Sequence, residues 1–132
     1  MIVLDASAAV SVLLNVDRVA RDLRYRIQQP DESLHVPHLF DVEVLHVLRR
    51  HSFSGALSER RERVALDRLS STRMTRYPHT ALLGRIWELK NNLTAYDAAY
   101  VALAESLAAP LVTLDGRLSQ APGLRAPVEV YG

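Results

Sequence analysis

The stretch from Leu93 to Ala104 constrains the fold of this chain more than any other. Thr94 is followed three residues later by Asp97, a capping-box pair that marks the start of a helix. Beyond this cap the helix is apolar almost all round, with Glu105 as nearly its only charge, and such a helix is normally buried. Asp97 is therefore expected where free amide groups and the helix dipole favour an anion. This position suits a helix cap and also a metal ligand.

Short apolar runs that alternate with helical patterns predict a parallel sheet. The expected strands are residues 2–4, 34–36, 74–77, 111–114 and, at an edge, 127–131. The expected helices cover residues 8–14, 16–29, 39–50, 80–89 and 94–107, with a further helix from Ser58. Continuously apolar strands are buried on both faces. We therefore predict an α/β fold, a three-layer α/β/α sandwich with a central parallel sheet of four to five short strands, in one domain over residues 1–132.

Helical spacing predicts which side chains face the core. In the helix that begins near Leu39, these are Val42, Leu45 and Leu48. In two other helices the apolar residues are Val16, Val19, Ala20, Leu23 and Ile27, and Leu82, Leu83, Ile86 and Trp87. The helix from Ser58 carries charges of both signs, which is typical of a solvated face, with a phosphate-binding face as the alternative.

Composition limits the possible functions. A formal charge of +1 gives no overall attraction to nucleic acid, so such an activity must come from a local site. The absence of cysteine excludes disulfides, zinc–thiolate sites and thiol catalysis. No apolar run is long enough to span a bilayer, and the N-terminus lacks the pattern of a signal peptide. We expect a cytoplasmic protein without a membrane contact.

Two of the predicted strands end on aspartate, Asp5 and Asp115. In open α/β sheets, ligands bind beyond the carboxyl ends of the strands, where the strand order reverses. If these strands are neighbours, about 4.8 Å apart, the two carboxylates start within reach of one ion. Asp97 and Glu43, each near the N-terminal end of a helix, are expected to reach the same rim.

Carboxylates packed together repel one another unless a cation is held between them. Ligation by oxygen alone favours Mg²⁺, with Mn²⁺ also plausible, and such an ion activates water and neutralises charge on phosphoryl oxygens. Hydrolysis of a nucleic-acid backbone is therefore the leading chemistry. Thr113, two residues before Asp115, is expected to hold a metal-bound water, and Ser7 to orient Asp5.

Each acid also has a purely structural interpretation. Asp97 could serve only as a capping-box acid, Asp5 only as a helix cap, Asp115 only as part of a turn, and Glu43 only as a first-turn acid next to Asp41. Two apolar strands that both end on aspartate in one small parallel sheet favour a shared site over these separate explanations.

Several motifs resemble the PIN-domain ribonucleases, and closely the VapC-like toxins of type II toxin–antitoxin systems. They are Met-Ile-Val-Leu-Asp-Ala-Ser-Ala at residues 1–8, the stretch 93–104 with Tyr-Asp-Ala-Ala-Tyr, Leu-Val-Thr-Leu-Asp-Gly-Arg-Leu at 111–118, and Glu43 in the third helix. The likeness runs nearly from end to end, and the order and spacing of the second and third motifs are specific. Asp5 with Ser7 alone would be a weak signal.

The resemblance implies a parallel sheet between helices, an acidic pocket for Mg²⁺ or Mn²⁺, RNA cleavage, homodimers, and inhibition by a cognate VapB-like antitoxin. By position, Asp5, Glu43, Asp97 and Asp115 look like the metal-binding, catalytic acids and Thr113 like the water-holding catalytic hydroxyl. Asp41 lies close to Glu43 in the sequence, so the choice between these two acids stays open.

Two other kinds of function are compatible with the same sequence. A catalytically silent PIN-like domain would bind RNA or a protein without cutting. A receiver-like phospho-acceptor would also place acids at strand ends, but it needs a lysine after a late strand, and the only lysine, Lys90, precedes a helix. A nucleotide-binding enzyme is poorly supported because the chain has neither a phosphate-binding glycine loop nor a GxGxxG motif.

Overall fold

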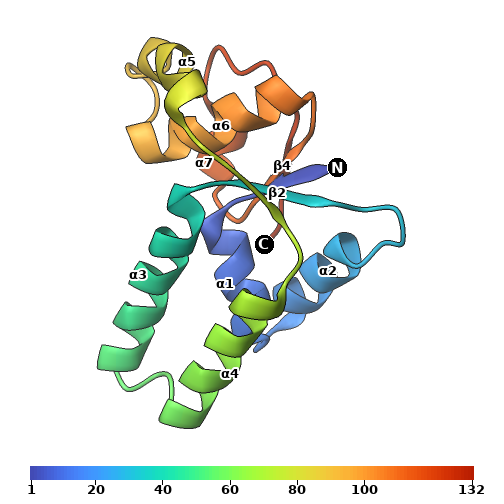
Figure 1. Ribbon diagram of the computed structural model, residues 1–132, viewed down its shortest axis with the longest axis vertical. Helices are drawn as coiled ribbons and strands as arrows, with labels where there is room; N and C mark the ends of the chain where they lie inside the picture. The colour runs from blue at the N-terminus through green and yellow to red at the C-terminus, as the bar shows by residue number, and fades with distance from the viewer.

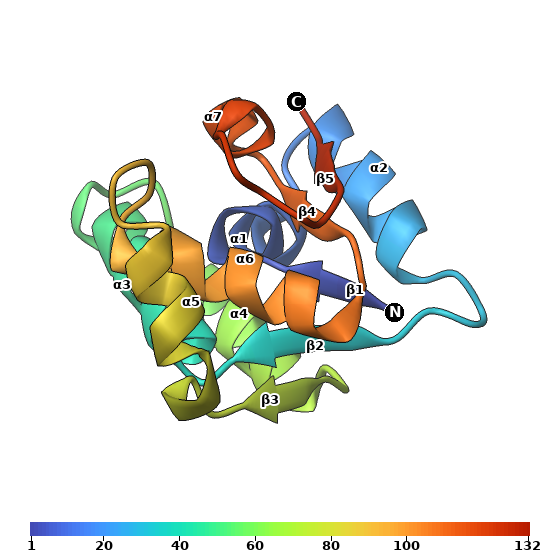
Figure 2. The ribbon, with the colours of Figure 1, turned by 90° about the horizontal axis from the view of Figure 1, so that it is seen from above.

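The computed structural model describes residues 1–132, and its centre is a five-stranded parallel sheet (Figures 1 and 2). The strands are β1 (Ile2–Leu4), β2 (Leu34–Pro37), β3 (Thr75–Tyr77), β4 (Leu111–Thr113) and β5 (Val128–Val130). They lie in the order β3-β2-β1-β4-β5, and every neighbouring pair is parallel. The predicted parallel sheet is confirmed, with β1 as its central strand.

Helices cover both faces of this sheet. They are α1 (Ala6–Leu14), α2 (Arg18–Ile27), α3 (Leu39–Phe53), α4 (Glu59–Ser71), the 3-10 helix η1 (Thr80–Leu82), α5 (Leu83–Glu88), α6 (Ala95–Leu107) and α7 (Gly116–Gln120). In Figure 1, α5 and α6 lie above the sheet, and α1, α2, α3 and α4 lie below it. This is the predicted three-layer sandwich. None of the helices combines the length and the apolar character needed to cross a membrane.

Helix α6 is buried, as its composition predicts. Every residue from 98 to 104 is buried, and the helix contacts β1, β2 and β4. The hydroxyl of Thr94 accepts a hydrogen bond from the amide of Asp97 at 3.2 Å, so the predicted N-cap is also confirmed. Alanines on the buried surface let this helix lie close to the sheet, which fixes the position of Asp97 relative to the strand ends.

The core-facing side of α3 differs from the prediction. Val42 is 70% exposed and Leu45 is 45% exposed, whereas Phe40, Val44 and Leu48 are buried. The structure follows the i, i+4, i+8 stripe that begins at Phe40, because this large aromatic side chain fills the core at the first turn of the helix. The buried stripe leaves Glu43 on the adjoining face of the helix.

Other helices also differ from their predicted limits. The helix expected at 16–29 begins only at Arg18, after Asp17 caps it, and Val16 is 67% exposed. The helix expected at 80–89 is a 3-10 turn followed by the short α5, and its side chains Leu83 and Trp87 are exposed. Helix α7 was not predicted at all, because Asp115 with Gly116 resembled a simple turn.

Candidate active site

All four predicted acids line one cavity of about 430 Å³. Asp5 follows β1, Asp115 follows β4 through Leu114, Glu43 belongs to α3, and Asp97 belongs to the first turn of α6. The cavity therefore lies at the point where the chain order of the sheet reverses between β1 and β4. Side chains as far apart in the sequence as Asp5 and Asp115 share this one space.

Asp5 is only 7% exposed and accepts hydrogen bonds at both carboxylate oxygens. Its Oδ1 accepts from the hydroxyl of Ser7 at 2.6 Å and from the amide of Ala8 at 3.0 Å, which makes it the N-cap of α1. Its Oδ2 accepts from the hydroxyl of Thr113. The predicted contact between Ser7 and Asp5 is present. Asp5 also serves as the N-cap of α1.

Strand register explains why Thr113 meets Asp5. Leu4 pairs with Val112, so Asp5 lies beside Thr113, and Asp115 lies two residues further along. The buried Thr113 hydroxyl donates a hydrogen bond to Asp5 and accepts one from the backbone amide of Asp115 at 2.9 Å. Its observed contacts position two acids, whereas the water-holding role of Thr113 stays a prediction.

The choice between Glu43 and Asp41 has a geometric answer. Glu43 lines the cavity, and its Oε1 atom is buried without a hydrogen-bond partner. Asp41 is turned away onto β3, where Arg76 donates to its two carboxylate oxygens at 2.6 and 2.9 Å. Glu43 is therefore the acid of α3 that can contribute to the site.

Burial raises the pKa of both Glu43 and Asp97, and the neighbouring carboxylates raise it further. For Glu43 these neighbours are Asp97 and Asp5, and for Asp97 they are Asp115 and Asp5. The pKa of Tyr100 is also raised, first by burial and then by Glu43, and its hydroxyl is buried without a well-formed hydrogen bond. The cavity thus disfavours the negative charges that its own side chains carry.

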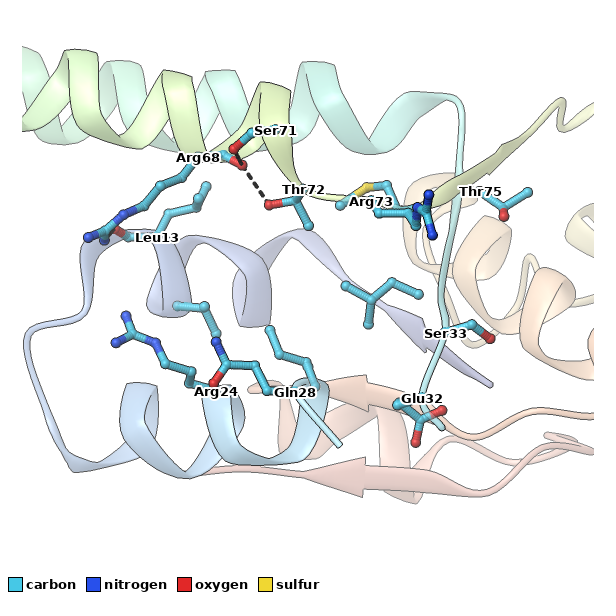
Figure 3. A pocket seen from close by; sticks show the side chains of 14 residues that line it. Leu13, Arg24, Gln28, Glu32, Ser33, Arg68, Ser71, Thr72, Arg73 and Thr75 are labelled. Carbon is cyan, nitrogen blue, oxygen red and sulfur yellow. Dashed lines mark hydrogen bonds between the residues drawn. The ribbon is translucent and has the colours of Figure 1, made fainter. Parts of the chain in front are cut away.

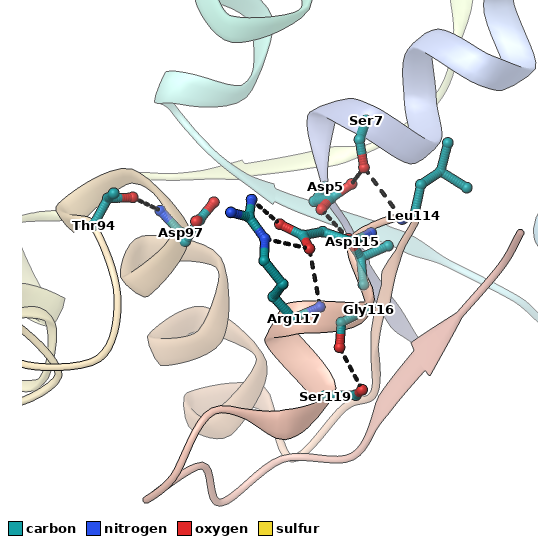
Figure 4. Close-up of polar contacts among 10 residues, drawn as sticks. Asp5, Ser7, Thr94, Asp97, Leu114, Asp115, Gly116, Arg117 and Ser119 are labelled. Atoms are coloured by element: carbon teal, nitrogen blue, oxygen red, sulfur yellow. Dashed lines mark hydrogen bonds and ion pairs between the residues drawn. The ribbon is translucent and has the colours of Figure 1, made fainter.

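Asp115 differs from the other acids because it forms an ion pair. It is the N-cap of α7, and its Oδ1 accepts from the backbone amide of Arg117 at 3.0 Å. The guanidinium donates from Nε to Oδ1 at 3.0 Å and from Nη2 to Oδ2 at 2.8 Å (Figure 4). Hydrogen bonding to Arg117 lowers the pKa of Asp115. No sequence pattern indicated this pair.

The donor set fits a hard divalent cation. The four acids supply only oxygen, and the partnerless buried Oε1 of Glu43 is an acceptor that a cation would satisfy. No three acidic or histidine side chains converge closely enough to enclose an ion as they stand. Asp115 has both of its oxygens on Arg117, so completing a site requires a side-chain movement.

Other residues that line the cavity had no predicted role. Tyr100 lies three residues after Asp97, and Arg50 lies seven residues after Glu43, spacings that place each pair on one helix face. Those spacings are a signal that could have identified them. His51 and Asp17 also line the cavity, and Asp17 caps α2.

A second cavity, of about 770 Å³, lies between α1, α2 and α4 and does not contain the acids (Figure 3). Arg24, Arg68 and Arg73 line it. Its one acid, Glu32, pairs with Arg26 and with the N-terminal amine. This arginine-lined cavity has no cluster of carboxylates, so it lacks the ligands that a hard divalent cation prefers.

Comparisons with known proteins agree with this fold. The family model described as PIN domain matches residues 2–124. The chain is 48% identical to ribonuclease VapC9 of Mycobacterium tuberculosis, with 98% of each chain covered, and 43% identical to ribonuclease VapC1 of the same organism, with 97% of this chain and 96% of the relative covered. The crystal structure of VapBC2 from Rickettsia felis, bound to a DNA fragment from their promoter, matches with a TM-score of 0.71 at 16% identity over all of both chains. The chain therefore belongs to the PIN-domain family and, within it, to the VapC ribonucleases.

Proposed function

We propose that this chain is a divalent-metal-dependent endoribonuclease that hydrolyses RNA at the acidic cavity, and that it is the toxin of a toxin–antitoxin pair. The observation that carries the proposal is the meeting of Asp5, Glu43, Asp97 and Asp115 around one cavity. Its relatives at 40–48% identity over nearly their full length are ribonucleases by name, which supports RNA as the substrate.

Mg²⁺ is the cation we propose for the four acids, with Mn²⁺ as the alternative that oxygen ligation also allows. A divalent ion there would activate water and neutralise the charge that develops on the phosphoryl oxygens. Asp5 provides the most fixed carboxylate, because Ser7, Ala8 and Thr113 all donate to it. Glu43 and Asp97 contribute half-buried carboxylates whose pKa values are raised first by burial and then by the neighbouring acids, so a cation beside them would be favourable.

The cavity also offers positive charge for the RNA backbone. Arg50 and His51 line it from α3, and neither forms an ion pair. Arg50 lies seven residues from Glu43, or about 10 Å along the helix axis, so it can contact a phosphate beside the one being cut. We propose that RNA enters past these two residues toward the acids.

We propose a VapB-like antitoxin as the partner that inhibits the chain. Support comes from the fold match to a protein of the VapBC2 complex from Rickettsia felis. A basic antitoxin side chain placed among the four acids would form desolvated, charge-assisted hydrogen bonds and would compete with the cation. We also propose a cytoplasmic location, where cellular RNA is within reach.

A homodimer is the assembly that we propose for the chain. On α5, Leu83 is 56% exposed and Trp87 is 69% exposed. Large apolar side chains at a surface often mark an interface. Light scattering of the purified chain should give twice the monomer mass of 14.8 kDa, and a monomer for the wild type would refute the dimer while leaving the nuclease proposal intact.

RNA cleavage by matched variants tests the proposed function. Metal-depleted wild type should cut RNA only after Mg²⁺ is added, and Asp97→Asn should lower the cleavage rate by about 10². Asp41→Asn is the matched control, because Asp41 is an acid of α3 that faces away from the cavity and binds Arg76. Cleavage that is equal in wild type and Asp97→Asn, or that needs no metal, would contradict the proposal. RNA binding without cleavage would identify a catalytically silent domain instead.

A further inference from the structure

Arg117 is the one basic residue that forms an ion pair with any of the four acids, and its partner is Asp115. Its guanidinium donates to both oxygens of Asp115, at 3.0 Å from Nε and 2.8 Å from Nη2. In Figure 4 the guanidinium lies between the carboxylates of Asp115 and Asp97. Arg50 and His51 line the same cavity but form no ion pair with its acids.

The contact occupies the part of Asp115 that a divalent ion would need. A bidentate arginine uses both oxygens of a carboxylate, and the backbone amide of Arg117 adds a third hydrogen bond to Oδ1. The amide and the guanidinium together take up two acceptor positions of Oδ1 and one of Oδ2, so an ion at Asp115 either displaces the guanidinium or binds Oδ2 directly beside it. The side chain and the ion carry charge of the same sign, so each weakens the binding of the other.

The arginine side chain is placed so that it can leave easily. It is 90% exposed, and its guanidinium forms hydrogen bonds only with Asp115. Exposed ion pairs of this kind contribute little to stability. After the guanidinium leaves, Asp115 would still cap α7, because its carboxylate accepts the hydrogen bond from the backbone amide of Arg117 and not from the side chain.

We propose that Arg117 is an internal countercharge of the acidic site, which competes with the divalent cation for Asp115 and so sets the cation concentration at which the site fills. The inference rests on the proposed function, since it concerns the same four acids. On this proposal the Arg117–Asp115 contact differs from a simple surface ion pair, because the side chain of residue 117 affects the affinity of the site for the metal ion.

Calorimetric titration with Mn²⁺ alone, without RNA, tests this inference. Arg117→Gln should bind Mn²⁺ about fivefold more tightly than wild type, which is the scale expected for loss of one exposed competing ion pair. Arg117→Lys should fall between the two, because an ammonium keeps the charge but cannot form the bidentate contact. Arg60→Gln is the matched control: it removes the same charge from an exposed site on α4 that forms no ion pair, and its Mn²⁺ affinity should equal that of wild type.

Thermal unfolding gives a second readout that does not depend on activity. Mn²⁺ should raise the midpoint of Arg117→Gln more than that of wild type at the same concentration, because tighter binding to the folded state stabilises it more. Equal or weaker Mn²⁺ affinity of Arg117→Gln would overturn the inference. Asp97→Asn separates this failure from failure of the proposed function, since unchanged Mn²⁺ binding in that variant would refute the metal site itself.

Discussion

Asp5 and Asp115 follow neighbouring parallel strands, yet the chain fixes them in opposite ways. Asp5 is buried, and its hydrogen bonds come from Ser7, Ala8 and Thr113, all in or beside the core. Asp115 is only half-buried, and the side chain that neutralises it, Arg117, is 90% exposed. The end of β1 is therefore rigid, and the end of β4 is adjustable.

This difference separates two requirements of an acidic active site. A preorganised carboxylate lets the site bind its cation without reorganising at the moment of reaction. An adjustable carboxylate with its own countercharge lowers the repulsion between four acids that share one cavity. Asp5, at the end of β1, meets the first requirement, and Asp115, at the end of β4, meets the second.

The largest expected effect distinguishes the two aspartates in RNA cleavage. Asp5→Asn should lower the cleavage rate at saturating Mg²⁺ by about 10² to 10³, the loss that follows removal of one preorganised electrostatic group. Asp115→Asn should cost less, about tenfold to a hundredfold, because its carboxylate is shared with an exposed arginine. A larger loss for Asp115→Asn than for Asp5→Asn would reverse the comparison.

The rigidity of the β1 end can be tested through Thr113. Thr113→Val should lower the free energy of unfolding by about 1–3 kcal/mol, because it leaves the Oδ2 atom of buried Asp5 and the amide of Asp115 each without a hydrogen-bond partner. Urea denaturation in a chelating buffer measures this loss. Thr75→Val, on the exposed edge strand β3, is the matched control and should change stability little. Equal effects of the two substitutions would show that Thr113 does not support the site.

Repulsion within the cavity predicts the sign of a pH effect. Burial raises the pKa of Asp97 above its unfolded value, so its contribution to stability is present at low pH and is lost as the pH rises through the folded-state pKa. Asp97→Asn avoids that loss. In a chelating buffer the variant should therefore melt higher than wild type at neutral pH, and the gap should close as the pH falls toward the ordinary aspartate value of about 3.9. Asp31→Asn, in an exposed turn, should not show this pattern.

The smallest expected effect lies outside the cavity. Asp41→Asn breaks the ion pair with Arg76, whose side chains are 33% and 35% exposed, and should cost no more than about 1 kcal/mol of stability. Its Mn²⁺ affinity should equal that of wild type in calorimetry. A clear loss of Mn²⁺ binding would mean that Asp41, and not Glu43, serves the site.

The sequence predicted the parts of the molecule that local patterns determine. Continuous apolar runs located the strands, and Thr94 with Asp97 located the start of α6. Acids at strand ends could be assigned to one rim because carboxyl ends of parallel strands share an edge. Asp5 and Asp115 were identified in this way. Asp97 and Glu43 were identified from their positions near helix starts and from the family resemblance, and all four acids line one cavity.

What the sequence did not predict depends on how side chains pack and turn in three dimensions. The buried face of α3 is set by Phe40 filling the core, so the predicted inward residues Val42 and Leu45 are exposed. Register between β1 and β4 brings Thr113 to Asp5, and no local pattern gives that register. The bidentate contact of Arg117 depends on the turn into α7, which the sequence alone did not indicate as a helix.

Anomalous diffraction from crystals soaked in Mn²⁺ tests most directly whether the four acids share one divalent ion. We expect a peak within bonding distance of Asp5, Glu43, Asp97 and Asp115, with the guanidinium of Arg117 moved away from at least one oxygen of Asp115. A cavity without a peak at saturating Mn²⁺, or a peak bound only by acids elsewhere such as Asp41, would contradict it.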